Sequence, residues 1–467
     1  MEIFIVAVFI LGYLAITVEH TIKIDKLVPA LLMMALAWAG VTFGLDGFTQ
    51  WFDSHASALM NGENGTENFA LMGHEAKLHV MENTLLHHFG KTCEILIFLI
   101  GAMTIVEIVD HFHGFSTIKS FIRTNKKRTL LWIIAILAFI LSAIIDNLTA
   151  TIVLITILRK LLSDSKDRIW FAGMIIIAAN AGGAWSPIGD VTRTMLWMGG
   201  KVSAMDLFAK LIIPSIICMV VPTLIASFSK AFKGSFELPP ESEFSNKRGP
   251  LMLYLGLGMI VFVPIFKTIT HLPPYVGMML SLGIVALVAE IISARQFTLS
   301  YAGAGKEEND DDVADRGEGG GHHESPTFRA LTKIEMPSIL FFLGILMTVA
   351  ALESLGLVFN FGQSVSASMH TDVFVMLLGF GSAVIDNVPL VAASMGMFQN
   401  EMDHHVWHFI AYAAGTGGSM LIIGSAAGVV AMGMERISFF WYLKNISWLA
   451  LAGYVGGAVA YILMNPM

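Results

Sequence analysis

Two short phrases place carboxylates inside strongly apolar sequence. Residues 142–153 read SAIIDNLTATIV and residues 382–393 read SAVIDNVPLVAA, so Asp146 and Asp386 are each followed by an asparagine. A third carboxylate, Asp190, ends the run AANAGGAWSPIGD. A charged side chain at membrane depth is costly, and such residues usually serve an ion or proton pathway. The repetition of the phrase favours this interpretation over a chance hydrogen bond between helices.

The polar groups near these carboxylates are oxygen ligands, which suit a hard monovalent cation such as Na⁺ or Li⁺. Partly desolvated carboxylates are also expected to exchange protons. A carboxylate that holds either a proton or a cation, but not both, is the central part of an exchanger. We expect Na⁺ at Asp146, Asn147, Asp190 and Asn387. The other candidate ligands are Asp386, Asn180, Ser142, Thr192, Ser382, Thr416 and Ser425.

Simpler roles stay open for some of these residues. The asparagine at a hairpin tip is expected to cap the helix that follows it. Serine and threonine hydroxyls in membranes often only join neighbouring helices. Neither phrase contains a lysine or arginine that could pair with an anionic substrate. The one basic residue close to the candidate ligands is Arg193, just past Asp190.

The composition identifies the chain as an integral membrane protein. Of its 467 residues, 55% are hydrophobic and only 14% are charged, whereas soluble domains carry about 25% charged residues. Apolar runs of roughly 20 residues recur, which predicts helical spans in contact with membrane lipid. No basic patch indicates nucleic acid, and no nucleophile–base pattern or metal-ligand cluster indicates an enzyme or a bound cofactor. The two cysteines, Cys93 and Cys218, are expected to be buried thiols.

Basic residues mark the first phrase as the tip of a re-entrant hairpin. KSFIRTNKKR directly precedes the apolar segment 129–158 and RKLLSDSKDR directly follows it. Because positive charge marks the cytoplasmic side, both ends of this segment belong there. The segment cannot cross once and keep both ends inside, and two crossings would need about 40 residues. A hairpin that enters from the cytoplasm fits both the length and the charges.

The second phrase has the opposite surroundings. No lysine or arginine occurs from Leu357 to His408, while Glu401 and Asp403 follow the apolar part, so the hairpin 371–397 should enter from outside. Gly, Ser, Thr and Asn also cluster within apolar runs at 169–199 and 408–435, which predicts a broken helix after each hairpin. Two such elements that enter from opposite faces form an inverted repeat.

These features predict an all-α polytopic membrane protein built as an inverted-topology repeat of two halves, 1–249 and 250–467. Each half is expected to contain five crossings, a re-entrant hairpin and a broken helix, because an odd number of crossings inverts the second half. Residues 47–92 then form an external loop that carries several histidines, and 296–333 form a solvated linker. Both termini are expected outside.

The residue pattern favours exchange of Na⁺ or Li⁺ for H⁺ by alternating access. The main alternative is Na⁺-coupled symport of a small anion such as a dicarboxylate, which could use the same sodium ligands. A channel or a non-transporting receptor is disfavoured, since paired inverted breaks are typical of alternating access.

SAIIDNLTATIV, AANAGGAWSPIGDVT, SAVIDNVPLVAA and GTGGSMLIIGSAAG together resemble the NhaD-type sodium/proton antiporter family. The resemblance implies Na⁺(Li⁺)/H⁺ exchange in a bacterial inner membrane, a homodimer, and a transport domain that moves against a scaffold. The family's polar positions correspond to Ser142, Asp146, Asn147, Asn180, Asp190, Thr192, Ser382, Asn387 and, in addition, Ser419. Related symporters have a Ser-Asn-Thr phrase at the hairpin tips. The aspartate found here instead argues against an anionic substrate.

Overall fold

The computed structural model describes residues 1–17, 23–53, 58–62, 68–122, 124–236, 248–304, 325–384 and 387–465, without the side chains of 119–121 and 295–304. The chain divides into two compact units. The first unit comprises residues 1–97, 122–241 and 336–467, and the second comprises 98–121 and 242–335. The units therefore cut across the two sequence halves, because each gathers segments from both sides of residue 250.

The first unit contains the hairpins and the broken helices. Its helices are α1 (Glu2–Thr17), α3 (Leu27–Gly44), α5 (Lys127–Ile145), α6 (Asn147–Leu161), α7 (Ser165–Gly183), α8 (Val191–Met198), α9 (Ala204–Ser227), α13 (Met336–Ser354), α14 (Leu357–Ser368), α15 (Thr371–Ser382), α16 (Asn387–Met397), α17 (His405–Gly417), α18 (Ala426–Glu435), α19 (Phe439–Asn445) and α20 (Ser447–Met464). A short antiparallel ribbon pairs β1 (Phe52–Asp53) with β2 (Ala58–Leu59).

The second unit contains α10 (Gly249–Thr270), α11 (Pro274–Ala304), α12 (Pro326–Lys333) and the 3₁₀ segment Gly114–Phe121. The helix α4 (His74–His111) begins in the first unit and ends in the second. Within the described residues, eight helices are long and apolar enough to cross a membrane. The protein is therefore a multi-pass, all-α membrane protein, as the sequence predicts.

Two segments are more helical than the sequence suggests. The helix α4 begins at His74, inside the expected external loop, and its first turns pack on the chain before it: Lys77 is buried and donates to the backbone oxygens of Asp46 and Phe48. The expected linker also contains helix at both ends, the last turns of α11 and all of α12. An apolar-run search misses such polar helical turns, since it detects only the membrane-embedded part of a helix. The middle of the linker, 305–324, lies outside the described residues.

The first hairpin returns to the side on which it begins. Its limbs are α5 and α6, which meet at Asp146. Lys127, at the start of α5, pairs with Asp167 at the start of α7 across 2.5 Å. Arg159, in the last turn of α6, and Arg168 of α7 both bind the buried carboxylate of Glu435. These five residues define what we call the basic end of the first unit.

The second hairpin has the same form. Its limbs are α15 and α16, and α17 follows. Asp372, in the first turn of α15, accepts from His405 Nε2 at 2.8 Å, and His405 is the first residue of α17. The ring of Phe398, just after α16, packs against Phe374 of α15 and Trp407 of α17. These residues define the acidic end, to which Asp403 also belongs.

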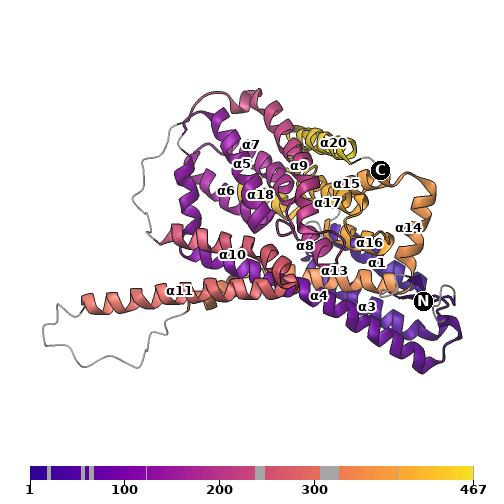
Figure 1. Ribbon diagram of the computed structural model, residues 1–467. Helices are drawn as coiled ribbons and strands as arrows, with labels where there is room; N and C mark the ends of the chain where they lie inside the picture. Colours follow the sequence, from indigo (N-terminus) through magenta and orange to yellow (C-terminus); the bar gives the residue numbers. More distant parts are fainter. Residues whose placement is uncertain are drawn as a thin grey trace. The chain divides into compact units, whose positions relative to one another are not determined.

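The two broken helices run in opposite directions between these ends. The first begins at the basic end with α7, and the chain that follows α8 reaches the acidic end, where Ser203 N donates to Asp403 at 2.6 Å. The second begins at the acidic end with α17, and α18 finishes at the basic end with Glu435. The repeat is therefore inverted. Figure 1 shows the result: α18 lies with α6 and α7, whereas α16 lies with α8.

Candidate ion-binding site

Asp146 forms the tip of the first hairpin in an unusual backbone conformation. Its φ of +93° lies where side-chain-bearing residues are strained, a feature that concentrates at functional sites. Its side chain accepts from Thr149 N at 2.7 Å and from Thr149 Oγ1 at 2.9 Å, and so caps α6. The expectation that the tip asparagine is the cap is wrong for this hairpin, because Asn147 is already the first helical residue and a cap must precede it.

Asp190 is the centre of the hydrogen-bond network. It caps α8, and its Oδ1 accepts from Thr192 N at 2.8 Å and from Thr192 Oγ1 at 2.7 Å. Its Oδ2 accepts from the side-chain amides of Asn147 at 3.0 Å and Asn387 at 3.2 Å. One carboxylate therefore joins the first broken helix to the tips of both hairpins.

The amide groups extend this network into the second broken helix. Asn147 Nδ2 also donates to Asn180 Oδ1 at 3.0 Å, and Asn180 Nδ2 donates to Ser425 Oγ at 3.1 Å. Ser425 in turn caps α18 through Gly428 N. Because the amide nitrogens of Asn147 and Asn387 donate to Asp190, their amide oxygens are not engaged by that carboxylate. Such oxygens are suitable ligands for a monovalent cation.

The interruptions of the two broken helices explain why these polar groups converge. The first helix is interrupted between Gly183 and Val191 and the second between Gly417 and Ala426. A side chain at Gly182 would collide with the backbone of Phe139 in α5, and one at Gly417 would collide with Gly379 in α15. Each break therefore packs directly on a hairpin. The starts of α6, α8, α16 and α18 meet the ends of α5, α7, α15 and α17, which brings both partial charges of the helix dipole to the site.

The remaining predicted ligands mainly hold the repeat together. Ser142 Oγ donates to Ala179 O at 2.6 Å, and its equivalent Ser382 donates to Ala414 O at 2.5 Å. Thr416 and Ser419 bond to the backbone of their own segment, at Tyr412 O and Thr416 O. These four hydroxyls are engaged with carbonyls, so the simpler role describes them in this conformation. Asp386 lies outside the described residues.

Known proteins resemble this chain along most of its length. A family model described as "Citrate transporter" matches residues 9–301. "Sodium/proton antiporter 2" of Arabidopsis thaliana is 38% identical over 84% of this chain and 90% of its own length. "Na(+)/H(+) antiporter NhaD" of Vibrio cholerae is 30% identical over 98% of this chain and 91% of its own. The chain belongs to the NhaD-type sodium/proton antiporter family.

Two further comparisons concern a longer relative and a solved structure. "Sodium/proton antiporter 1" of Arabidopsis thaliana is 42% identical over 82% of this NhaD-type chain, which spans 64% of that relative's length. The crystal structure of the Alcanivorax borkumensis YdaH transporter covers 93% of the chain and 98% of its own, with a TM-score of 0.54 and 13% identity. That structure supports the fold, while the sequence relatives, which are named as transporters, support the family.

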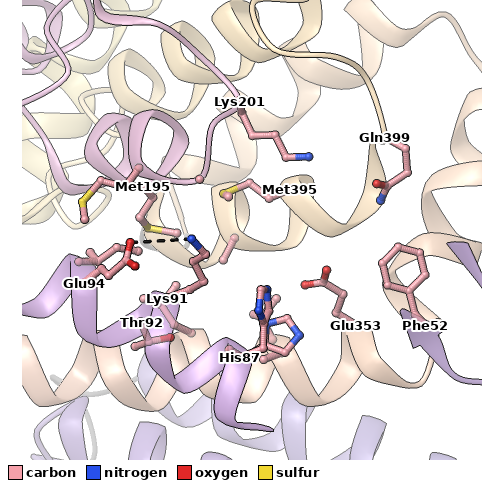
Figure 2. Close-up of a pocket in the computed structure, with 18 residues that line it drawn as sticks. Phe52, His87, Lys91, Thr92, Glu94, Met195, Lys201, Glu353, Met395 and Gln399 are labelled. Carbon is pink, nitrogen blue, oxygen red and sulfur yellow. Dashed lines mark ion pairs between the residues drawn. The ribbon is translucent and has the colours of Figure 1, made fainter. Parts of the chain in front are cut away.

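The NhaD-type chain also has a cavity of about 230 Å³ next to α8 and α16. The helix α8 begins just after Asp190, and α16 ends just before Phe398 of the acidic end. Figure 2 shows Glu353 of α13 pointing into it, with Lys201 on the opposite wall and Gln399 to one side. Lys91 and Glu94 of α4 also line it and form an ion pair of 3.9 Å with each other. Burial lowers the pKa of Lys201, and the carboxylate of Glu353 opposes that shift.

The sequence of the NhaD-type chain gives no signal that would single out Glu353 or Glu435, since each is one carboxylate beside apolar sequence. Only the folded chain brings Glu353 to a cavity and places two arginines on Glu435. Arg193 did carry a signal, since it is a lone cation within a polar break.

Proposed function

We propose that this chain is a secondary transporter that exchanges Na⁺ for H⁺ across a membrane by alternating access, with Asp146 as the carboxylate that binds either ion. The proposal also includes Asn147, Asn387 and Asp190 as the groups that complete the sodium site. The relatives named as sodium/proton antiporters support the reaction. The transported ions are its only small ligands, and no resident cofactor is required.

The contrast between the two described carboxylates carries the assignment. Both oxygens of Asp190 are filled by donors from Thr192, Asn147 and Asn387, and the side chain is only 6% exposed. Asp146 is half-buried and receives hydrogen bonds from Thr149 alone among the described side chains. A carboxylate with unfilled lone pairs and access to solvent is the better one to alternate between a proton and a cation.

Everted membrane vesicles test the proposal directly. Addition of Na⁺ to vesicles with an imposed pH gradient should collapse that gradient, and Asp146→Asn should abolish the response. Asp110→Asn, in the second unit, is the control that should retain exchange. Normal exchange by a folded Asp146→Asn variant would refute the role of Asp146, and no Na⁺ response in the wild type would refute the exchange itself.

Sodium-coupled symport of a small anion is the second candidate, because the matching family model is described as a citrate transporter. Uptake of labelled citrate or of a labelled dicarboxylate that requires Na⁺ would support it. The site disfavours it, since the fixed positive charge of Arg193 is already neutralised by Asp190 at 3.1 Å.

We further propose that the chain works as a homodimer in a bacterial inner membrane, with both termini outside, and that it accepts Li⁺ as well as Na⁺. Bacterial relatives of similar length and the basic residues at one end of the first unit support this placement. Cysteine labelling at either terminus in intact cells would test the orientation.

A further inference from the structure

Arg193 is a buried cation inside the ion-binding site. It lies on α8, one turn after Asp190, and its side chain is 0% exposed. Its Nη1 donates to Thr192 Oγ1 at 2.6 Å and lies 3.1 Å from Asp190 Oδ1. Burying a guanidinium is unfavourable unless a partner compensates the charge. Asp190 provides that partner, so the two residues form one buried ion pair.

The second half of the repeat lacks both charges and leaves room for this one. Alignment of AANAGGAWSPIGDVTR with AAGTGGSMLIIGSAAG places Ser425 opposite Asp190, Gly428 opposite Arg193 and Gly415 opposite Asn180. A Cβ atom on Gly415 would collide with the guanidinium of Arg193. The ion pair therefore occurs in only one of the two repeats. The absence of a side chain at Gly415 leaves the space that the guanidinium of Arg193 occupies.

The pair fixes the charge of the site. Asp146 and Asp190 contribute two negative charges, and the positive charge of Arg193 offsets one of them. Without Arg193 the same oxygen ligands would surround two uncompensated carboxylates. Oxygen sites with more than one carboxylate are the kind that bind Ca²⁺, and charge count tunes their affinity.

We propose that Arg193 is a specificity-determining residue: a built-in counter-ion that restricts the site to one monovalent cation and excludes divalent cations. The inference rests on the proposed function, because it assigns a selectivity to the same sodium site. Arg193 acts through Asp190 and through its fixed charge, without binding the transported ion.

The test measures Na⁺/H⁺ exchange and its inhibition by Ca²⁺ in proteoliposomes of the full-length protein. In Arg193→Gln, half-inhibition by Ca²⁺ should require at least tenfold less Ca²⁺ than in the wild type, and the KM for Na⁺ should fall. Arg193→Lys keeps the charge and should keep the wild-type response to Ca²⁺. A structural role alone would lower the rate in both variants without a change in ion preference.

A charge-matched pair of variants provides a second, independent comparison. Asp190→Asn leaves Arg193 uncompensated next to the site and should raise the KM for Na⁺. The double variant Asp190→Asn/Arg193→Gln restores the net charge that the wild-type site carries and should have a KM at least threefold lower than Asp190→Asn. This comparison decides the matter if Arg193→Gln alone does not fold, as judged by gel filtration in detergent.

Two results would overturn the inference: unchanged Ca²⁺ inhibition in folded Arg193→Gln, or equal KM values for Asp190→Asn and the double variant. Both differ from failure of the proposed function, in which wild-type proteoliposomes would show no Na⁺-dependent proton movement at all.

Discussion

Asp146 and Asp190 are the same residue type in two different hydrogen-bonding environments. Asp190 accepts hydrogen bonds from three segments and holds the hairpin tips together. Asp146 is strained at φ +93° and keeps lone pairs free for an exchangeable ion. The proposed function therefore assigns organisation of the site to Asp190 and exchange to Asp146, although both side chains are carboxylates in polar breaks.

The asparagine amides are expected to tune Na⁺ affinity through Asp190. Asn147→Ala removes bonds to both Asn180 and Asp190, whereas Asn387→Ala removes the bond from Asn387 to Asp190. Since loss of a hydrogen bond to a buried charge costs about 1–3 kcal/mol, the KM for Na⁺ should rise about tenfold in Asn147→Ala and less in Asn387→Ala. The Na⁺ dependence of exchange measures both. Asn445→Ala, on α19, is the control, and a KM equal to that of the wild type in Asn147→Ala would contradict the prediction.

At the scale of elements, ion pairs fasten the ends of the hairpins. Lys127 with Asp167 joins α5 to α7, and Glu435 joins α18 to both α6 and α7. The ion pairs of Glu435 connect the two halves of the repeat at the basic end. Its carboxylate is only 2% exposed and forms ion pairs with both arginines.

Glu435→Gln should therefore destabilise the first unit. The variant keeps the shape of the side chain but loses charge-assisted bonds to Arg159 and Arg168, each of which is worth roughly 1.5–3 kcal/mol. We expect a lower midpoint of thermal unfolding in detergent. Glu401→Gln, at an exposed position near the acidic end, should leave the midpoint unchanged. Equal midpoints for the two variants would show that the ion pairs of Glu435 do not contribute to stability.

The cavity next to α8 and α16 should assist cation entry through Glu353. The carboxylate points into the cavity, which Met195 and Met395 also line, and its loss removes an attractive charge from that cavity. Glu353→Gln should raise the KM for Na⁺ severalfold with little change in the maximal rate. Glu94→Gln is the matched control, because Glu94 lines the same cavity but already pairs with Lys91. A similar KM in both variants would argue against a role for Glu353.

For the whole molecule, the sequence predicts the repeat well because two independent signals coincide. Polar breaks locate the hairpins and broken helices, and the lysines and arginines give their direction. The breaks after Ile145 and Gly183 fall within the predicted segments. Contacts between distant segments could not be predicted in this way: the bond from Asn387 to Asp190 and the arginines on Glu435 depend on packing that periodicity does not encode. The early start of α4 was missed because its first turns are polar.

Alternating access predicts that the hairpin tips move together relative to α13 and α14. A Cβ atom on Gly396 of α16 would lie 3.1 Å from Val358 of α14, so cysteines at these positions are close enough to be joined by a short thiol-specific cross-linker. In a background without Cys93 and Cys218, cross-linking of Val358→Cys/Gly396→Cys should reduce Na⁺/H⁺ exchange at least tenfold, because α16 could no longer move past α14. Reductant that cleaves the linker should restore exchange.

The matched control joins two elements that are expected to move as one body. A Cβ atom on Gly381 of α15 would lie 3.7 Å from Leu390 of α16, within a single hairpin. Cross-linking of Gly381→Cys/Leu390→Cys should therefore leave most of the exchange activity intact. Full activity of the cross-linked Val358/Gly396 pair would mean that α14 and α16 keep their contact throughout the cycle, and the moving boundary would then have to lie elsewhere in the first unit.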